Sequence, residues 1–116
     1  LKVLAVDDDG LILMNTVAML EDLGHNALEA SSGAAALDIL RREKVDLVIT
    51  DHAMPRMTGM ELARAIGELS PGTPIILATG YAEVPGGSDP GLPRLPKPFG
   101  QQELARIIAQ SMKTSA

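Results

Sequence analysis

Cysteine is absent from this chain of 116 residues, and its only aromatic residues are Tyr81 and Phe99. Without cysteine there is no disulfide framework, no thiolate nucleophile and no cysteine-ligated zinc site. With so few aromatic side chains, the core must consist of aliphatic residues and methionine, which a hydrophobic content of 46% can supply. The length is typical of one domain, so we expect residues 1–116 to fold as a single unit.

Positive charge and long hydrophobic runs are scarce as well. The chain has 10 Lys and Arg residues against 15 Asp and Glu residues, a formal net charge of −5. Because binding to nucleic acid requires a basic face, we expect no direct contact with it. No run approaches the roughly 20 apolar residues that span a bilayer, and no signal-peptide pattern opens the chain. We therefore expect a cytoplasmic setting without membrane contact by this domain. Since the chain begins with Leu1 rather than Met, we interpret it as part of a longer protein.

Short apolar runs alternate with segments of helical periodicity. Continuous runs are typical of strands buried on both faces, and they predict strands over residues 3–6, 27–30, 47–49, 74–79 and 92–95. Apolar spacing and capping residues predict helices that begin after Asp9, Ser32 and Thr58, and a last helix over residues 103–112. Alternating strands and helices indicate an α/β fold, with a parallel sheet and helices on both faces.

One helix of this alternating pattern has no clear counterpart in the sequence. Between the fourth and fifth predicted strands, residues 85–91 read Pro-Gly-Gly-Ser-Asp-Pro-Gly. Glycine and proline are too frequent there for a regular helix, so we expect a loop and a fourth helix that is short or missing. Apart from the weak strand predicted over residues 92–95, the sequence does not determine the conformation of residues 82–95.

Polar residues follow the ends of four predicted strands. Residues 7–9 are three aspartates after the first strand, Asp51 ends the third, Thr79 ends the fourth, and Lys97 follows the fifth. In a parallel sheet these ends meet at one edge. Two carboxylates about 5 Å apart repel by roughly 3 kcal/mol at an effective dielectric of 20, which a stable core does not need. A hard cation such as Mg²⁺ relieves the repulsion, and a carboxylate beside it can accept a phosphoryl group.

Four motifs carry a family resemblance that covers essentially the whole chain. They are Val6-Asp7-Asp8, residues 51–59 with the pattern Asp-x-x-Met-Pro-x-Met-x-Gly, Ala78-Thr79-Gly80, and Lys97-Pro98-Phe99. Together they resemble the response-regulator receiver domain of two-component signalling. The resemblance implies a flavodoxin-like, doubly wound sheet of five parallel strands in the order 2-1-3-4-5. It also implies phosphorelay signal transduction by a phosphoacceptor rather than an enzyme.

Residue by residue, the resemblance implies a role for each motif. Asp51 would accept the phosphoryl group from a phosphohistidine on a histidine kinase or a histidine phosphotransfer domain. Asp8, Asp51 and the backbone carbonyl of Ala53 would ligate Mg²⁺, and Asp7 would act through water. Thr79 would donate a hydrogen bond to the bound phosphoryl group, and Lys97 would pair with it. Asp9 is equally well explained as the cap of the first helix.

One position departs from the family pattern. The residue three before Lys97 is Arg94, at a position where receivers often carry an aromatic residue that moves during switching. Tyr81, two residues after Thr79, is the only nearby aromatic that could move instead. The truncated segment after the fourth strand, with the stretch Thr79-Gly80-Tyr81-Ala82, resembles receivers found in hybrid histidine kinases, and we favour that origin. The cognate kinase, the stimulus, the output and the oligomeric state do not follow from the sequence.

Two alternatives remain open from the residues alone. Residues 6–10 contain the Asp-x-Asp-Gly pattern that opens haloacid-dehalogenase-type phosphatases, in which Asp7 would be the nucleophile. That reading lacks the expected second acidic pair, because only Glu103 follows Lys97. The other alternative is a receiver-like docking module that is never phosphorylated. The acidic cluster argues against it without excluding it.

Overall fold

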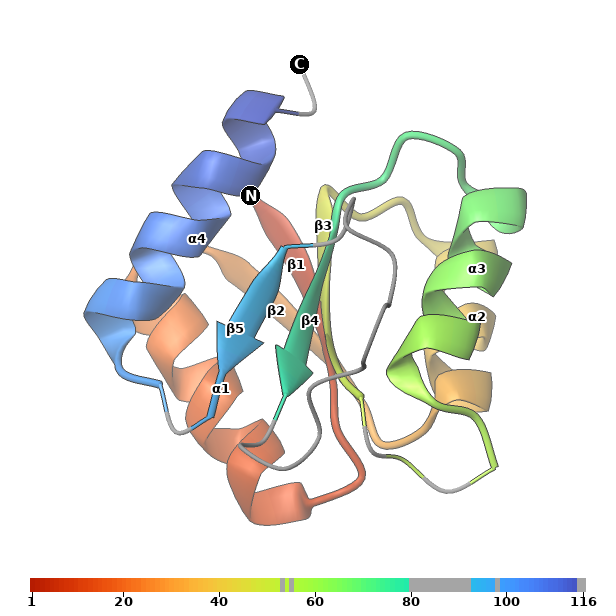
Figure 1. Ribbon diagram of the computed structural model, residues 1–116, viewed down its shortest axis with the longest axis horizontal. Helices are drawn as coiled ribbons and strands as arrows, with labels where there is room; N and C mark the ends of the chain where they lie inside the picture. Colours follow the sequence, from red (N-terminus) through yellow and green to blue (C-terminus); the bar gives the residue numbers. More distant parts are fainter. Residues whose placement is uncertain (53, 55, 80–92, 98, 115–116) are drawn as a thin grey trace.

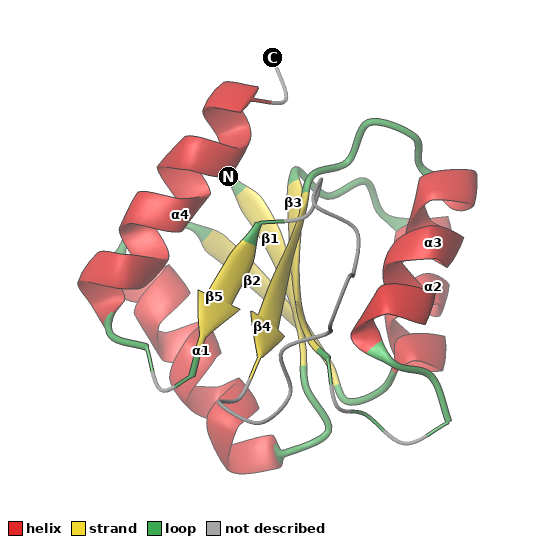
Figure 2. Ribbon diagram, in the orientation of Figure 1, coloured by secondary structure: helices red, strands yellow, loops and turns green. Residues whose placement is uncertain are grey.

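The computed structural model describes residues 1–52, 54, 56–79, 93–97 and 99–114. Its centre is a parallel sheet with helices on both faces, drawn in Figure 1 and, by type of element, in Figure 2. The strands are β1 (Lys2–Val6), β2 (Asn26–Ala30), β3 (Leu47–Asp51), β4 (Ile75–Thr79) and β5 (Arg94–Pro96). They lie in the order β2-β1-β3-β4-β5. The predicted fold class, a flavodoxin-like five-stranded parallel sheet, is confirmed.

The helices form two layers. Helices α1 (Gly10–Asp22) and α4 (Gln101–Thr114) cover one face of the sheet, and α2 (Gly33–Arg42) and α3 (Gly59–Leu69) cover the other (Figure 1). Successive side chains of a strand point to opposite faces, so β1 contributes to two cores. Val3 and Ala5 pack in the core beneath α1 and α4, whereas Leu4 and Val6 pack beneath α2 and α3. Both cores are aliphatic, as the composition predicts.

The strand register aligns the carboxyl ends of the central strands. Val6 of β1 pairs with Thr50 of β3, and the next residue of β3, Asp51, pairs with Ala78 of β4. Thr79, the last residue of β4, pairs with Pro96 of β5. The residues that follow these ends therefore emerge side by side at one edge of the sheet.

Capping residues define the helix boundaries as predicted. The Asp9 side chain accepts hydrogen bonds from the first backbone amides of α1, and the Ser32 hydroxyl accepts one at the start of α2. Thr58 and Glu61 form the predicted capping box of α3. Gly24 follows α1 with φ +93, a left-handed conformation that a residue without Cβ adopts readily.

Several element boundaries differ from the prediction by one or two residues, and the structure gives a reason for three of them. Strand β2 begins at Asn26 because Asn26 pairs with Lys2, a backbone contact that hydrophobicity does not signal. Strand β5 covers Arg94–Pro96, displaced toward the C-terminus, and its register is set by β4. Helix α4 begins at Gln101, next to Gly100, whose amide donates to the Glu103 carboxylate.

The predicted loss of the helix between β4 and β5 falls on residues 80–92, which lie outside the described residues. Within the described part of the chain, no helix combines the length and the apolar character needed to cross a membrane.

Candidate functional site

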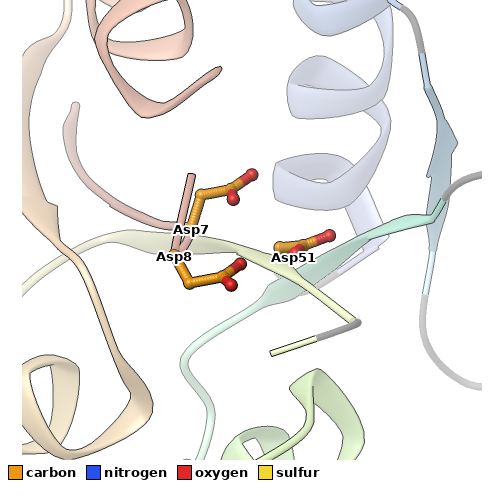
Figure 3. A group of neighbouring side chains, drawn as sticks. All are labelled: Asp7, Asp8 and Asp51. Atoms are coloured by element: carbon orange, nitrogen blue, oxygen red, sulfur yellow. The ribbon is translucent and has the colours of Figure 1, made fainter. Parts of the chain in front are cut away.

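Three aspartates gather at the carboxyl edge of the sheet. Asp7 and Asp8 follow β1, and Asp51 is the last residue of β3. Each offers one carboxylate oxygen, and these three oxygens lie within 4.8 Å of one another. In Figure 3 the side chains of Asp7 and Asp8 are directed toward Asp51. Asp7 and Asp51 are buried, with 6% and 4% of their surface exposed, whereas Asp8 is exposed at the rim.

Lys97 is the cationic partner of this cluster. Its ammonium lies 2.6 Å from Oδ1 of Asp51 and 3.4 Å from Oδ2 of Asp7. Burial opposes the charge of the ammonium, but the hydrogen bond to Asp51 and the charges of Asp51 and Asp7 outweigh burial and raise the pKa of Lys97 above its ordinary value. The backbone fixes its position, because the Lys97 amide donates to the Thr79 carbonyl at 2.8 Å.

Asp7 and Asp9 have distinct structural roles beside the cluster. The Asp9 carboxylate accepts hydrogen bonds from the amides of Leu11 and Ile12, so it caps α1. The Asp9 amide donates to Oδ1 of Asp7 at 2.9 Å, which holds the Asp7 carboxylate in place. The interpretation of Asp9 as a helix cap is confirmed, and Asp9 is not one of the three grouped aspartates among the described residues.

Of the remaining candidate residues, the structure describes some and not others. Thr79 is buried, with 3% exposed, at the end of β4 next to Lys97. Ala53, whose carbonyl is a candidate ligand, lies outside the described residues, as do Tyr81 and Pro98. The structure thus brings Asp7, Asp8 and Asp51 together with Lys97 and does not describe the remaining ligand.

The donor set suits a hard divalent cation. Carboxylate oxygens are the protein ligands that Mg²⁺ prefers, and Mg²⁺ usually keeps several waters and a substrate phosphate besides one or two carboxylates. Asp51 and Asp7 are buried, while Asp8 faces solvent at the rim, so a cation at the cluster would remain accessible from outside. Lys97 neutralises only part of the negative charge of the three aspartates.

Two features near the site were not predicted from the sequence. Thr16 is a buried polar residue of α1, with 6% exposed, and it lines a small cavity together with Asp7 and Asp51. Its only signal is helical spacing, three residues after Leu13 and four before Leu20, which places it on the buried side of α1. Arg56, in the segment after Asp51, has φ +71, which no local pattern indicates.

The surface of α1 beside the cluster is unusually apolar. Leu11 is 66% exposed and Met14 is 62% exposed, and both lie in the first half of α1, which begins next to the three aspartates. Behind them, Ile12, Met19 and Phe99 line an open groove of about 360 Å³ that reaches Lys97. Exposed large apolar side chains grouped at a functional edge are typical of a protein-binding surface.

Known proteins share both the sequence and the fold. Residues 3–109 match the family model of the response regulator receiver domain. The transcriptional regulatory protein GlrR of Escherichia coli K12 is 37% identical over 97% of this chain, which spans only 26% of GlrR. The response regulator receiver protein CpdR of Brucella abortus is 34% identical, with 96% of each chain covered. The sensor kinase CckA of the same organism is 34% identical over 96% of this chain, which covers 12% of that kinase.

A solved structure gives the same result. The crystal structure of a response regulator receiver domain protein from Clostridium thermocellum matches with a TM-score of 0.89 and 32% identity, covering 97% of this chain and 94% of the other. Residues 3–109, which match the family model, include the three aspartates of the cluster and Lys97. The chain belongs to the family of response regulator receiver domains, the signalling domains of two-component systems.

Proposed function

We propose that this chain is a single receiver domain that accepts a phosphoryl group on Asp51 in a Mg²⁺-dependent reaction. The observation that carries the proposal is the position of the Asp51 carboxylate. It lies 2.6 Å from the Lys97 ammonium and shares one cluster with Asp7 and Asp8. A buried carboxylate that contacts an ammonium and has two further carboxylates nearby is suited to receive a phosphoryl group once a cation offsets the repulsion.

The reaction is a transfer between two protein side chains. A carboxylate oxygen of Asp51 attacks phosphorus of a phosphohistidine, the phosphorus–nitrogen bond breaks, and the histidine ring leaves with the electron pair. Asp8, Asp51 and the Ala53 carbonyl would hold Mg²⁺, which neutralises charge on the phosphoryl oxygens when it is bound. Lys97 would move its ion pair from the carboxylate to the phosphoryl group, and the Thr79 hydroxyl would donate a hydrogen bond to it.

The geometry favours Asp51 over Asp7 as nucleophile. The Lys97 ammonium, which would neutralise charge on the transferred group, lies 2.6 Å from Oδ1 of Asp51 and 3.4 Å from Oδ2 of Asp7, and the Asp9 amide holds the other oxygen of Asp7. A phosphatase of the haloacid-dehalogenase type would require Asp7 to be available for attack. The three grouped aspartates likewise favour a phosphoacceptor over a docking module, which has no need for crowded carboxylates.

The partner we propose is a histidine kinase or a histidine phosphotransfer domain in the cytoplasm. A transcriptional regulator, a receiver protein and a sensor kinase are all among the relatives, so similarity alone does not distinguish a hybrid kinase from a separate regulator. Origin in a hybrid kinase remains our prediction, and the sequence flanking this domain in its full-length protein tests it. The domain itself is a signalling phosphoacceptor, and with a net charge of −5 it makes no direct contact with nucleic acid.

Phosphorylation by a small donor tests the proposal. The purified domain is incubated with acetyl phosphate with and without Mg²⁺, and the modified residue is mapped by mass spectrometry. We expect one phosphoryl group on Asp51 that requires Mg²⁺, no modification of Asp51→Asn, and slow modification of Asp8→Asn. Modification of Asp7 in the wild type would support the phosphatase alternative instead. No modification under any condition, together with no binding of beryllofluoride, would support the docking module.

A further inference from the structure

A small cavity lies directly behind the aspartate cluster, between the sheet and α1. Among the described residues that line it, three are polar, Asp7, Thr16 and Asp51, and the others are apolar. All three polar residues are buried, with 6%, 6% and 4% of their surface exposed. The centre of a water molecule can occupy about 10 Å³ of the cavity. That is room for one water molecule and no larger ligand.

The hydrogen bonds of Thr16 determine what chemistry the cavity can accept. The Thr16 hydroxyl donates its one hydrogen to the Ile12 carbonyl at 3.0 Å. Its oxygen therefore keeps only acceptor capacity toward the cavity, and the ionised carboxylates of Asp7 and Asp51 are acceptors as well. An occupant that brings its own hydrogens can donate to the acceptor groups of these three residues. Water has two to donate, and a buried hydroxyl or carboxylate gains from each.

The position of Thr16 within α1 supports a polar role. The buried residues of α1 are Leu13, Thr16 and Leu20, so Thr16 interrupts an otherwise aliphatic side. Valine would fill nearly the same volume without a hydroxyl. The structural alternative, a threonine whose hydroxyl only bonds back to its own helix, accounts for the bond to Ile12 but not for the cavity shared with both carboxylates.

We propose that this cavity holds one ordered water molecule, which donates hydrogen bonds to Thr16 and to the carboxylates of Asp7 and Asp51. Thr16 is then a positioning residue, because it acts on the phosphoacceptor through the water rather than by contact with the phosphoryl group. The water would restrain the Asp51 carboxylate from behind, while Lys97 holds it at 2.6 Å. This role in phosphorylation rests on the proposed function, whereas the water site itself does not.

Solvent can reach the cavity from a neighbouring groove. Thr16 and Phe99 line both the cavity and the open groove of about 360 Å³ that extends along α1. Phe99 is half-buried and lines both spaces, so its ring is one of the side chains at their boundary. Exchange of the water therefore requires movement of side chains at this boundary and no unfolding of the sheet.

Two variants at one position test the water site. Thr16→Val removes the hydroxyl at nearly constant volume, and Thr16→Ser keeps the hydroxyl. High-resolution crystal structures of the unphosphorylated proteins are expected to show the water in the wild type and in Thr16→Ser, and not in Thr16→Val. We expect Thr16→Val to fold with an unchanged or higher melting temperature, because it removes a buried polar group. A wild-type cavity without water, or a water retained in Thr16→Val, would overturn the proposal.

A kinetic measurement tests the positioning role. With acetyl phosphate and saturating Mg²⁺, Thr16→Val is expected to be phosphorylated roughly fivefold more slowly than the wild type, the effect of about one lost hydrogen bond. Thr16→Ser should restore most of the rate, which a purely structural role would not predict. Equal rates for the wild type and Thr16→Val, with the water lost, would overturn the role of Thr16. If even the wild type is not phosphorylated, the proposed function fails, and the crystal structures still decide on the water.

Discussion

At the scale of single residues, Lys97 forms ion pairs with two buried carboxylates of the site. Its ammonium contacts the carboxylates of Asp51 and Asp7 within one partly buried space, and the pKa of Lys97 is raised above its ordinary value. A raised pKa in the folded state means that folding favours the protonated form. The associated stability is fully present below the pKa of the unfolded lysine, near 10.5, and is lost as the pH rises through the folded value.

We therefore predict a decline in the free energy of unfolding of the wild type above about pH 10.5 that Lys97→Met does not share. The two proteins share every other ionisable group, so the measured quantity is the difference in the free energy of unfolding between them. Urea unfolding between pH 7 and pH 11.5 gives that difference at each pH. A difference that stays constant, or grows with pH, would contradict the ion pair between Lys97 and the carboxylates.

The sequence predicts which residues meet at the site better than it predicts their individual geometry. Asp7, Asp51 and Lys97 meet because each lies at or just after the carboxyl end of a strand in a parallel sheet, and the sequence predicts where these strands end. The positive φ of Arg56 could not be predicted, because a bulky residue rarely adopts it. The hydrogen bond from the Asp9 amide to the Asp7 carboxylate could not be predicted either, since it depends on the path of the backbone after β1.

At the scale of elements, a glycine allows helix α3 to pack closely against strand β3. A Cβ atom built on Gly59 would lie 2.6 Å from the Asp51 carbonyl oxygen and 2.9 Å from Cα of His52. These are backbone atoms of β3 and of the residue after it, so they cannot move aside independently. Gly67, in the same helix, is exposed. A Cβ atom added to Gly67 would meet nothing within 4 Å beyond its chain neighbours and the backbone of its own helix.

This contrast within α3 gives a matched pair of variants. We predict that Gly59→Ala lowers the free energy of unfolding by about 1–3 kcal/mol, because the added methyl group overpacks a rigid contact. Gly67→Ala should raise it by about 0.5–1 kcal/mol, since alanine favours a helix interior and meets no obstacle. Chemical denaturation measures both values. Equal effects of the two substitutions would show that α3 does not pack against β3 as closely as described.

Helix α1 provides a second prediction, concerning its exposed apolar residues. If Leu11 and Met14 contact the kinase or phosphotransfer partner, Leu11→Ser and Met14→Ser should slow phosphoryl transfer from that partner several-fold. The rate with acetyl phosphate, which needs no docking surface, should stay unchanged. Leu69→Ser is the control, because Leu69 is also exposed, at 41%, but lies at the end of α3 away from the cluster. A similar loss for Leu69→Ser would argue against a specific role of α1.

Element boundaries could be predicted wherever a side chain defines them. Asp9, Ser32 and Thr58 all cap the helices that the sequence assigns to them, because capping is a local interaction between a side chain and nearby amides. The start of β2 at Asn26 and the position of β5 could not be predicted in the same way. Those boundaries depend on pairing with β1 and β4, which are distant along the chain.

At the scale of the whole molecule, the fold concentrates negative charge at one edge of the sheet. The chain has a net charge of −5, and three of its carboxylates share one cluster with a single contacting lysine among the described residues. A cation that binds only the folded state stabilises it by mass action, about 2.7 kcal/mol at a concentration 100 times the Kd. For a domain of this size that corresponds to roughly 10 °C in Tm.

We therefore predict that Mg²⁺ raises the Tm of the wild type in a saturable way and raises that of Asp8→Asn much less. Without Mg²⁺, Asp8→Asn should be at least as stable as the wild type, because removal of one carboxylate relieves repulsion at the cluster. Glu68→Gln, an exposed substitution with the same change in charge near the far end of α3, controls for the effect of net charge and should keep the full shift. Differential scanning calorimetry over a range of Mg²⁺ concentrations at constant ionic strength measures all three. An equal shift in the wild type and Asp8→Asn would place the cation elsewhere and remove the electrostatic basis for phosphorylation at Asp51.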